Sequence, residues 1–254
     1  MNRLEMGGFL DTLPRHERDI PGKPKAGVFI SGSGTNLQRL IDLSQAGLLR
    51  AEIPVVVSNK PGVLGLTRAE RANIPTEVIA FNDELLTDER KLDLDTRLVD
   101  TIDRNGLDMV VLAGYMGILR RRVLQAAVDR QIPILNLHPA LLTPDNAATI
   151  MTSRGEIPVI RGAHAIQDAF DQQLPVSGVT VHQILPGNPV DTGPIVLQRE
   201  VTRGDDETPD SWEAKIHKTE YEVLPKAVNT VARALKQGYD ASQGTLPWKE
   251  FAAF

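Results

Sequence analysis

Short apolar runs alternate with amphipathic segments from residue 26 onward, and this order constrains the fold more than any other feature of the chain. The apolar runs predict strands at 26–31, 52–58, 76–79, 109–113 and 134–136. The segments between them predict helices at 36–46, 64–72, 87–105 and 120–127. Strands and helices in alternation are joined by right-handed crossovers, so we predict a Rossmann-like, mostly parallel sheet with helices on both faces.

The pattern changes after residue 138. Two longer apolar runs, at 176–185 and 194–201, predict strands that pair antiparallel and extend the sheet in its C-terminal part. Residues 208–238 predict a long final helix. We expect one domain over residues 26–240. The polar, proline-containing residues 1–25 are expected to form a loosely ordered extension, and residues 241–254 a C-terminal tail.

The composition limits the class of protein. A net charge of −5 lacks the positive excess that nucleic-acid-binding proteins carry. No apolar stretch is long enough to span a bilayer, and the N-terminus has no apolar signal core. The chain has no cysteine, which excludes disulfides, thiolate catalysis and cysteine-ligated zinc, and agrees with a reducing compartment. We therefore expect a cytoplasmic protein with no nucleic-acid or membrane partner.

The apolar run at 134–139 ends in an amide, an imidazole and a proline. Asn136 and His138 are two residues apart, so on a strand both side chains point to the same face. An amide beside an imidazole can stabilise an oxyanion and manage a proton at one reacting centre. A hydrogen-bonded structural pair at a strand end is an equally good interpretation of these two residues alone.

A glycine-rich loop, Ser-Gly-Ser-Gly-Thr-Asn at 31–36, joins the first strand to the first helix. Glycines permit a sharp turn, and the free N–H groups and dipole of the helix N-terminus suit a phosphate. A tight turn without a ligand is the alternative. A dinucleotide fingerprint fits poorly, because Leu37 stands at the third glycine position and no acidic residue follows the second strand. A nucleoside-triphosphate loop is disfavoured because no Gly-Lys-Ser/Thr follows, so a phosphate monoester fits best.

Asp191 lies in a loop bounded by prolines and glycines, at 186–194. A carboxylate in such a loop is usually bonded to its own turn. The alternative is that Asp191 reaches His138, where a carboxylate favours the charged imidazolium and fixes the orientation of the ring. Separation along the sequence does not decide between the two.

Taken together and in this order, these features resemble the phosphoribosylglycinamide formyltransferase family. The matching segments are 29–38, 57–60, 111–119, 135–142, 161–164, 178–182 and 190–196. They extend from about residue 26 to the final helix, and the resemblance implies the formyltransferase fold. It also implies transfer of a formyl group from 10-formyltetrahydrofolate to the amine of glycinamide ribonucleotide, in de novo purine synthesis and without a metal. The expected partners are these small molecules. The protein itself is expected to be a monomer or a homodimer.

The resemblance implies a role for each matching residue. The catalytic residues are expected to be Asn136, His138 and Asp191. The ribonucleotide is expected to contact Gly34, Thr35 and Asn36 through its phosphate, and Glu220 elsewhere. The pterin is expected at Met116, Gly117, Ile118 and Leu119, and the folate tail at Lys91.

The chain departs from the family pattern in four places. Gly117 stands where an arginine is common, and Arg90 beside Lys91 leaves the register there open. The loop before Asp191 is longer by roughly two residues and lacks the usual acidic pair. Residues 143–160 form an insertion in a region that closes over the substrates in the family, so lid behaviour and substrate affinity are expected to differ.

The other histidines have weaker claims to a role. His164 is expected at the surface or at a helix cap, and His182 is expected to pack within its strand. His16 and His217 are expected to be solvated.

Three other functions compete with formyl transfer to the ribonucleotide. A formyltetrahydrofolate hydrolase would use the same three residues with water as acceptor, but we expect it to carry an additional regulatory domain before the catalytic one. An initiator transfer RNA formyltransferase would need an RNA-binding domain and a basic face. A catalytically silent binding module for folate or ribonucleotide is the third alternative, and it would show affinity without turnover.

Overall fold

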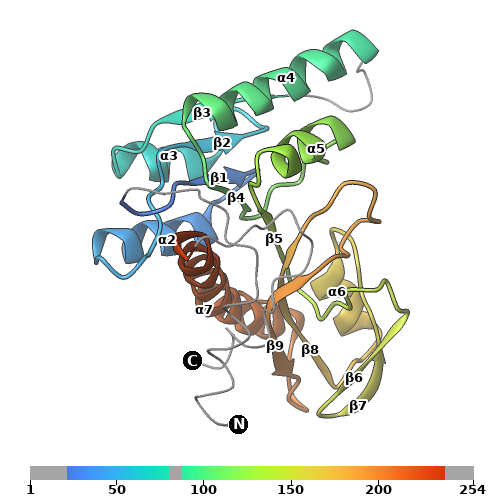
Figure 1. Ribbon diagram of the computed structural model, residues 1–254. Helices are drawn as coiled ribbons and strands as arrows, with labels where there is room; N and C mark the ends of the chain where they lie inside the picture. Colours follow the sequence, from blue (N-terminus) through green and yellow to red (C-terminus); the bar gives the residue numbers. More distant parts are fainter. Residues whose placement is uncertain (1–21, 81–86, 238–254) are drawn as a thin grey trace, which may run out of the picture.

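The computed structural model describes residues 22–80 and 87–237, and a mixed sheet forms the centre of these residues (Figure 1). Its seven strands lie in the order β3-β2-β1-β4-β5-β8-β9. They are β1 (Ala26–Ile30), β2 (Val56–Ser58), β3 (Thr76–Val78), β4 (Met109–Leu112), β5 (Ile134–His138), β8 (Val176–Gln183) and β9 (Ile195–Thr202). The first five strands run parallel, β8 pairs antiparallel with β5, and β9 pairs antiparallel with β8.

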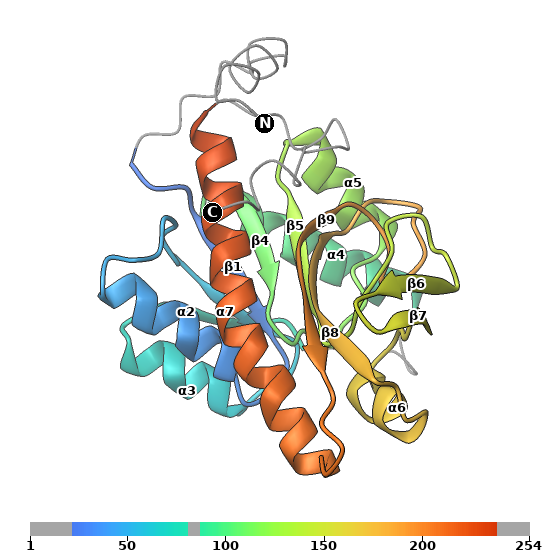
Figure 2. The same ribbon diagram turned by 90° about the horizontal axis from the view of Figure 1, so that it is seen from below.

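Helices cover both faces of the sheet. One face packs against α2 (Thr35–Gln45), α3 (Leu64–Arg71) and α7 (Pro209–Lys236), and Figure 2 shows α7 lying across the sheet on this side. The other face packs against α4 (Asp88–Arg104) and α5 (Arg121–Asp129). Strand side chains alternate between the two cores, so Val28 and Ile30 of β1 lie in the first and Phe29 in the second.

The long helix α7 begins and packs as its sequence dictates. Thr208 and Ser211 form a capping box at its N-terminus, and the proline that follows Thr208 suits the first turn because it has no N–H to satisfy. Its apolar stripe, which includes Trp212 and Ile216, is fully buried against the sheet. The structure gives this helix 28 residues, within the predicted span of 208–238.

The chain changes direction across the sheet between β1 and β4. After β1 it adds β2 and β3 on one side, and then crosses to add β4 and β5 on the other. The loops that follow β1 and β4 therefore diverge at the carboxyl ends of neighbouring parallel strands, where open α/β sheets bind ligands. The two loops are joined by Ser31, whose Oγ accepts a hydrogen bond from Met116 N at 2.7 Å and donates one to Asn59 Oδ1 at 2.5 Å.

The predicted fold class is confirmed, and the insertion at 143–160 has a structure that the sequence did not predict. It contains a hairpin of β6 (Thr149–Thr152) and β7 (Gly155–Pro158), followed by α6 (Ala165–Asp171). Figures 1 and 2 place the hairpin and α6 together beside β8 and β9. Apart from residues 22–25, the expected extension 1–25 and the tail 241–254 lie outside the described residues. Within the described ranges, no helix is long and apolar enough to cross a bilayer.

Candidate active site

The pairing of β5 with β8 builds one polar face. Its register sets Asn136 opposite His182 and His138 opposite Thr180. Residues two apart share a face of a strand, so all four side chains lie on the same side of the sheet. Asn136 and His138 therefore point the same way, as their spacing predicts.

The carboxylate of Asp191 reaches this face from the loop between β8 and β9. Its Oδ2 lies 3.5 Å from His138 Nδ1, and its Oδ1 accepts a hydrogen bond from Asn136 Nδ2 at 3.4 Å. Gly162 N also donates to Oδ2, at 2.8 Å. Of the two interpretations open from the sequence, the structure thus shows the contact with His138. Asp191 has a left-handed φ of 54°, a conformation that aspartate tolerates better than most residues.

The imidazole of His138 is buried, with oxygen atoms near both ring nitrogens. Its Nε2 lies 2.9 Å from the carbonyl oxygen of Ile160, while Asp191 faces Nδ1. A carbonyl only accepts, so Nε2 carries a hydrogen. The doubly protonated ring would satisfy both oxygens, and this is the form that can donate a charged hydrogen bond.

His182 belongs to the same cluster, although the sequence predicted only that it packs in its strand. Burial lowers the pKa of His182 to about 4, against an opposing effect of the Asp191 carboxylate, so the ring is neutral near pH 7. Its Nδ1 donates to the Thr192 carbonyl at 3.2 Å, which leaves Nε2 to accept the hydrogen bond from Asn136 Nδ2 at 3.1 Å. His182 thereby orients the amide of Asn136. The sequence predicted an antiparallel strand at 176–185 but not its register. The register with the strand at 134–138 is what sets His182 opposite Asn136.

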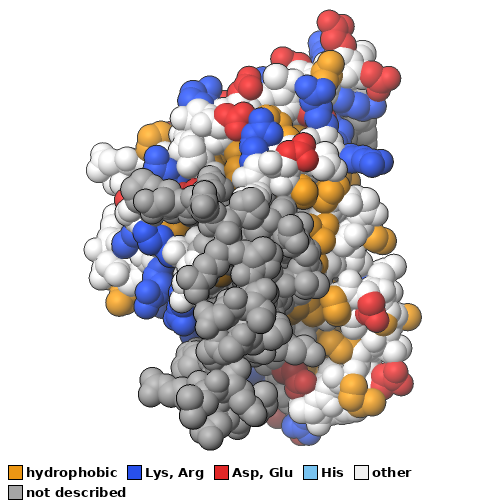
Figure 3. Space-filling view, in the orientation of Figure 1, with side chains coloured by type: hydrophobic (Ala, Val, Ile, Leu, Met, Phe, Trp, Pro, Cys, Tyr) orange, Lys and Arg blue, Asp and Glu red, His pale blue; other side chains and the backbone are white. Residues whose placement is uncertain are grey.

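The glycine loop leads directly into α2. Gly34 is the N-cap residue with a φ of 68°, and a Cβ there would lie 2.6 Å from Gly65 Cα in α3. A side chain would therefore both strain the turn and collide with the neighbouring helix. Thr35 and Asn36 form the first turn, where backbone N–H groups have no partner within the helix. Arg68 of α3 reaches this loop, because its Nε donates a hydrogen bond to the Ser33 carbonyl at 2.9 Å, and its positive charge favours an anionic ligand there. Figure 3 shows further Lys and Arg side chains over α2, on the side of the molecule that faces the viewer in Figure 1.

Glu220 of α7 lies beside this loop. Its carboxylate is buried and accepts hydrogen bonds from Asn36 Nδ2 at 2.9 Å and from His217 Nδ1 at 2.8 Å. The hydrogen bond with Glu220 raises the pKa of His217. His217 was expected to be solvated; its side chain is 38% exposed, but its ring is also held by Glu220, one turn further along the same helix.

A family model described as formyl transferase matches residues 25–228. The chain is 34% identical over 215 residues to a phosphoribosylglycinamide formyltransferase of Dictyostelium discoideum, covering 81% of this chain and 96% of that protein. A solved phosphoribosylglycinamide formyltransferase from Bacillus halodurans superposes with a TM-score of 0.70 at 29% identity, over 85% of this chain and 98% of that one.

The chain belongs to the formyl transferase family. The family resemblance inferred from the sequence is confirmed. The family also occurs within longer proteins: the chain is 33% identical over 221 residues to the trifunctional purine biosynthetic protein adenosine-3 of Bos taurus, covering 87% of this chain. It spans only 20% of the length of that relative.

The segment after β4 combines exposed and buried apolar residues. The side chains of Met116 and Ile118 are exposed, whereas Leu119 is buried in the core under α4 and α5. Gly117 between them has no side chain to contribute. Lys91 lies near this segment, because its carbonyl accepts a hydrogen bond from Arg120 at 2.8 Å, just before α5. The Lys91 ammonium pairs with Asp88 in the preceding turn of α4.

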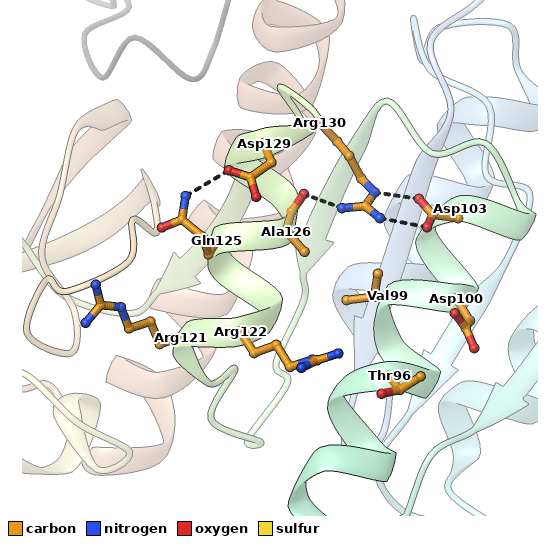
Figure 4. Close-up of a pocket in the computed structure, with 10 residues that line it drawn as sticks. All are labelled: Thr96, Val99, Asp100, Asp103, Arg121, Arg122, Gln125, Ala126, Asp129 and Arg130. Atoms are coloured by element: carbon orange, nitrogen blue, oxygen red, sulfur yellow. Dashed lines mark hydrogen bonds and ion pairs between the residues drawn. The ribbon is translucent and has the colours of Figure 1, made fainter.

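A hollow of about 680 Å³ lies between α4 and α5 and is shown in Figure 4. Arg130 spans it with a bidentate ion pair to Asp103 at 2.7 and 2.9 Å. It is lined by Thr96, Val99, Asp100, Asp103, Arg121, Arg122, Gln125, Ala126, Asp129 and Arg130, and so by none of the residues expected at the active site.

Two further observations complete the description of the site. His164 stands exposed at the start of α6, as expected from the sequence. In the part of the chain that the structure describes, no group of three or more histidine or carboxylate side chains is arranged to hold a metal ion.

Proposed function

We propose that this protein transfers a formyl group from 10-formyltetrahydrofolate to the amine of glycinamide ribonucleotide, a step of de novo purine synthesis. The observation that carries the proposal is the convergence of Asn136, His138 and Asp191 in one largely buried cluster. Two relatives that match at 33–34% identity over most of their length bear the name of this activity. The residue types in the cluster supply the chemistry that acyl transfer needs.

Asn136 and His138 would stabilise the charge that develops in the reaction. The substrate amine attacks the formyl carbon, and the formyl oxygen becomes negative. As this intermediate collapses, the bond between the formyl carbon and N10 of the folate breaks, and N10 takes up a proton that balances the one lost by the amine. Asn136 donates to the formyl oxygen through the Nδ2 hydrogen that otherwise forms the long 3.4 Å bond to Asp191, while its other hydrogen stays on His182. Protonated His138 adds a charged hydrogen bond. Removal of one such donor typically costs about 10²–10³ in turnover.

Asp191 would act on both the imidazole and the amine. Facing Nδ1 of His138, its carboxylate holds the ring in orientation and balances the positive charge. The attacking amine must lose a proton as the new bond forms. We assign this proton to Asp191, through a water, because its carboxylate contacts both Asn136 and His138.

The glycine loop and Glu220 would bind the ribonucleotide. The N-terminus of α2 offers backbone N–H groups and a positive dipole end to the phosphate at Gly34, Thr35 and Asn36. The buried Oδ1 of Asn36 has no hydrogen-bond partner among the described residues, which fits a donor from the ligand. The Glu220 carboxylate beside it can accept from a ribose hydroxyl.

The formyl donor would occupy the segment after β4. Met116 and Ile118 present exposed apolar side chains suited to the flat face of a pterin, while Gly117 and Leu119 would contribute backbone groups. Lys91, whose side chain is 42% exposed, is available to the carboxylates of the folate tail.

The experiment that tests this function is mass spectrometry of glycinamide ribonucleotide after incubation with 10-formyltetrahydrofolate and the protein. We expect a product heavier by one formyl group. Loss of the formyl group from the folate without that product would instead establish a hydrolase. Binding of both compounds without change in either would establish a silent binding module. The hydrolase is disfavoured because the glycine loop and Glu220 form an acceptor site that water does not need.

The reaction needs only small molecules, and the lack of cysteine agrees with a reducing compartment such as the cytoplasm.

A further inference from the structure

The inserted segment 143–160 ends directly on the proposed catalytic pair. The carbonyl of its last residue, Ile160, faces His138 Nε2 at 2.9 Å. Two residues later, Gly162 N donates to the carboxylate of Asp191. At the other end of the hairpin, Ser153 donates through its backbone N to Glu200 of β9, at 3.0 Å. The insertion is thus fixed to the sheet at its tip and to the catalytic residues at its base.

Arg161 joins the parts of this arrangement. Its Nη2 donates to Thr143 Oγ1 at 3.3 Å and to the Ala147 carbonyl at 3.1 Å, both near the start of the insertion. Its Nε donates to the Asp191 carbonyl at 3.4 Å. One guanidinium therefore ties both ends of the insertion to the loop that carries Asp191. The planar group has donors in several directions, which a lysine ammonium on a flexible stem does not reproduce.

We propose that Arg161 is a positioning residue, which holds the end of the insertion against His138 and Asp191 and so fixes the catalytic imidazole. The inference rests on the proposed function, since it assigns the imidazole its catalytic role. With Arg161 in place, the Ile160 carbonyl on Nε2 and the carboxylate near Nδ1 hold the ring from two sides. When the formyl oxygen takes the place of the Ile160 carbonyl on Nε2, the Asp191 carboxylate still holds the ring at Nδ1, because Arg161 Nε and Gly162 N keep Asp191 in place.

The test compares Arg161→Met and Arg161→Lys with Arg154→Met. Arg154 is an exposed arginine at the tip of the hairpin in the insertion, so its variant removes one positive charge, as the Arg161→Met variant does, but away from His138 and Asp191. For each protein, kcat and KM for the ribonucleotide are measured. The imidazole N–H signal of His138 is recorded by NMR on protein labelled with ¹⁵N in histidine, and is assigned by its loss in His138→Gln.

We expect Arg161→Met to lower kcat by roughly 10- to 100-fold, with KM for the ribonucleotide within about threefold, because a small misplacement of a catalytic group is costly. The slowly exchanging N–H signal of His138 should weaken or vanish. The kcat and the His138 signal of Arg161→Lys should lie between those of the unmodified protein and those of Arg161→Met. If Arg161→Met does not fold, Arg161→Lys is tested in its place. Arg154→Met should retain both the rate and the signal.

A lower kcat with an unchanged His138 signal would overturn the inference, because Arg161 would then act on something other than the imidazole. Equal effects in Arg154→Met, or no effect in either Arg161 variant, would overturn it as well. If the unmodified protein makes no formylated product, the proposed function fails, and the NMR comparison alone decides whether Arg161 fixes His138.

Discussion

Replacement of His182 by glutamine should make the folded protein less sensitive to acid. Burial lowers the pKa of His182 from its usual 6.5 to about 4, while the unfolded chain keeps the ordinary value. Between these two values the unfolded state binds a proton that the folded state does not. The free energy of unfolding therefore falls as the pH drops from 6.5 towards 4, and this contribution is intact above 6.5.

The size of the effect follows from the two pKa values. At about 1.4 kcal/mol for each pKa unit, the full loss is about 3 kcal/mol near pH 4, and about 2 kcal/mol of it is already reached at pH 5. Glutamine at this position offers an acceptor for Asn136 and a donor for the Thr192 carbonyl, but it does not titrate. The variant should therefore lack this part of the acid sensitivity.

The assay is urea unfolding of both proteins at pH 7 and pH 5, followed by circular dichroism and extrapolated to zero denaturant. For each protein, the decrease in the free energy of unfolding between pH 7 and pH 5 is measured. Other groups titrate equally in both proteins, so the difference between the two decreases reports on residue 182. We expect the unmodified protein to lose about 2 kcal/mol more than His182→Gln over this interval. Equal losses would refute the reasoning, because His182 would then be able to take up a proton in the folded state.

Three other predictions follow from the described contacts. Gly34→Ala should lower the free energy of unfolding by at least about 1 kcal/mol in urea melts, since the left-handed turn penalises a Cβ. Glu220→Gln should lower the pKa of His217 in an NMR titration, because the hydrogen bond between the two residues raises that pKa. The same variant should increase KM for the ribonucleotide roughly tenfold, with a smaller effect on kcat. Asp103→Asn breaks the surface ion pair with Arg130 and should lower the free energy of unfolding by no more than about 1 kcal/mol. The rate of formylation should be unchanged. A strongly reduced rate would instead indicate a functional site between α4 and α5.

The sheet could be predicted because strands buried on both faces need continuous apolar runs. The run at 109–113 is one such strand, and its predicted and observed bounds differ by a single residue. The hairpin of the insertion could not be predicted in this way. Only Ile157 of β7 is buried, and β6 is at most half-buried, so neither short strand leaves a clear apolar pattern.

The part of the site that lies on one strand could also be predicted. The common direction of Asn136 and His138 follows from the spacing of two residues alone. The contact of Asn136 with His182 depends on the register of two strands, and that of His138 with Asp191 depends on a left-handed turn. Neither is a local property of the chain. The pairing of His217 with Glu220 was available from their helical spacing of three residues.

The most direct test of the central claim is the rate of formyl transfer by His138→Ala and Asn136→Ala, measured beside the unmodified protein. Each variant is first shown to be folded by its urea midpoint and to bind the ribonucleotide. The account predicts that kcat falls by at least about 10² in each variant, because each loses a donor to the formyl oxygen. Near-normal turnover in one folded variant would contradict the catalytic role of that residue. Near-normal turnover in both would contradict the proposed site.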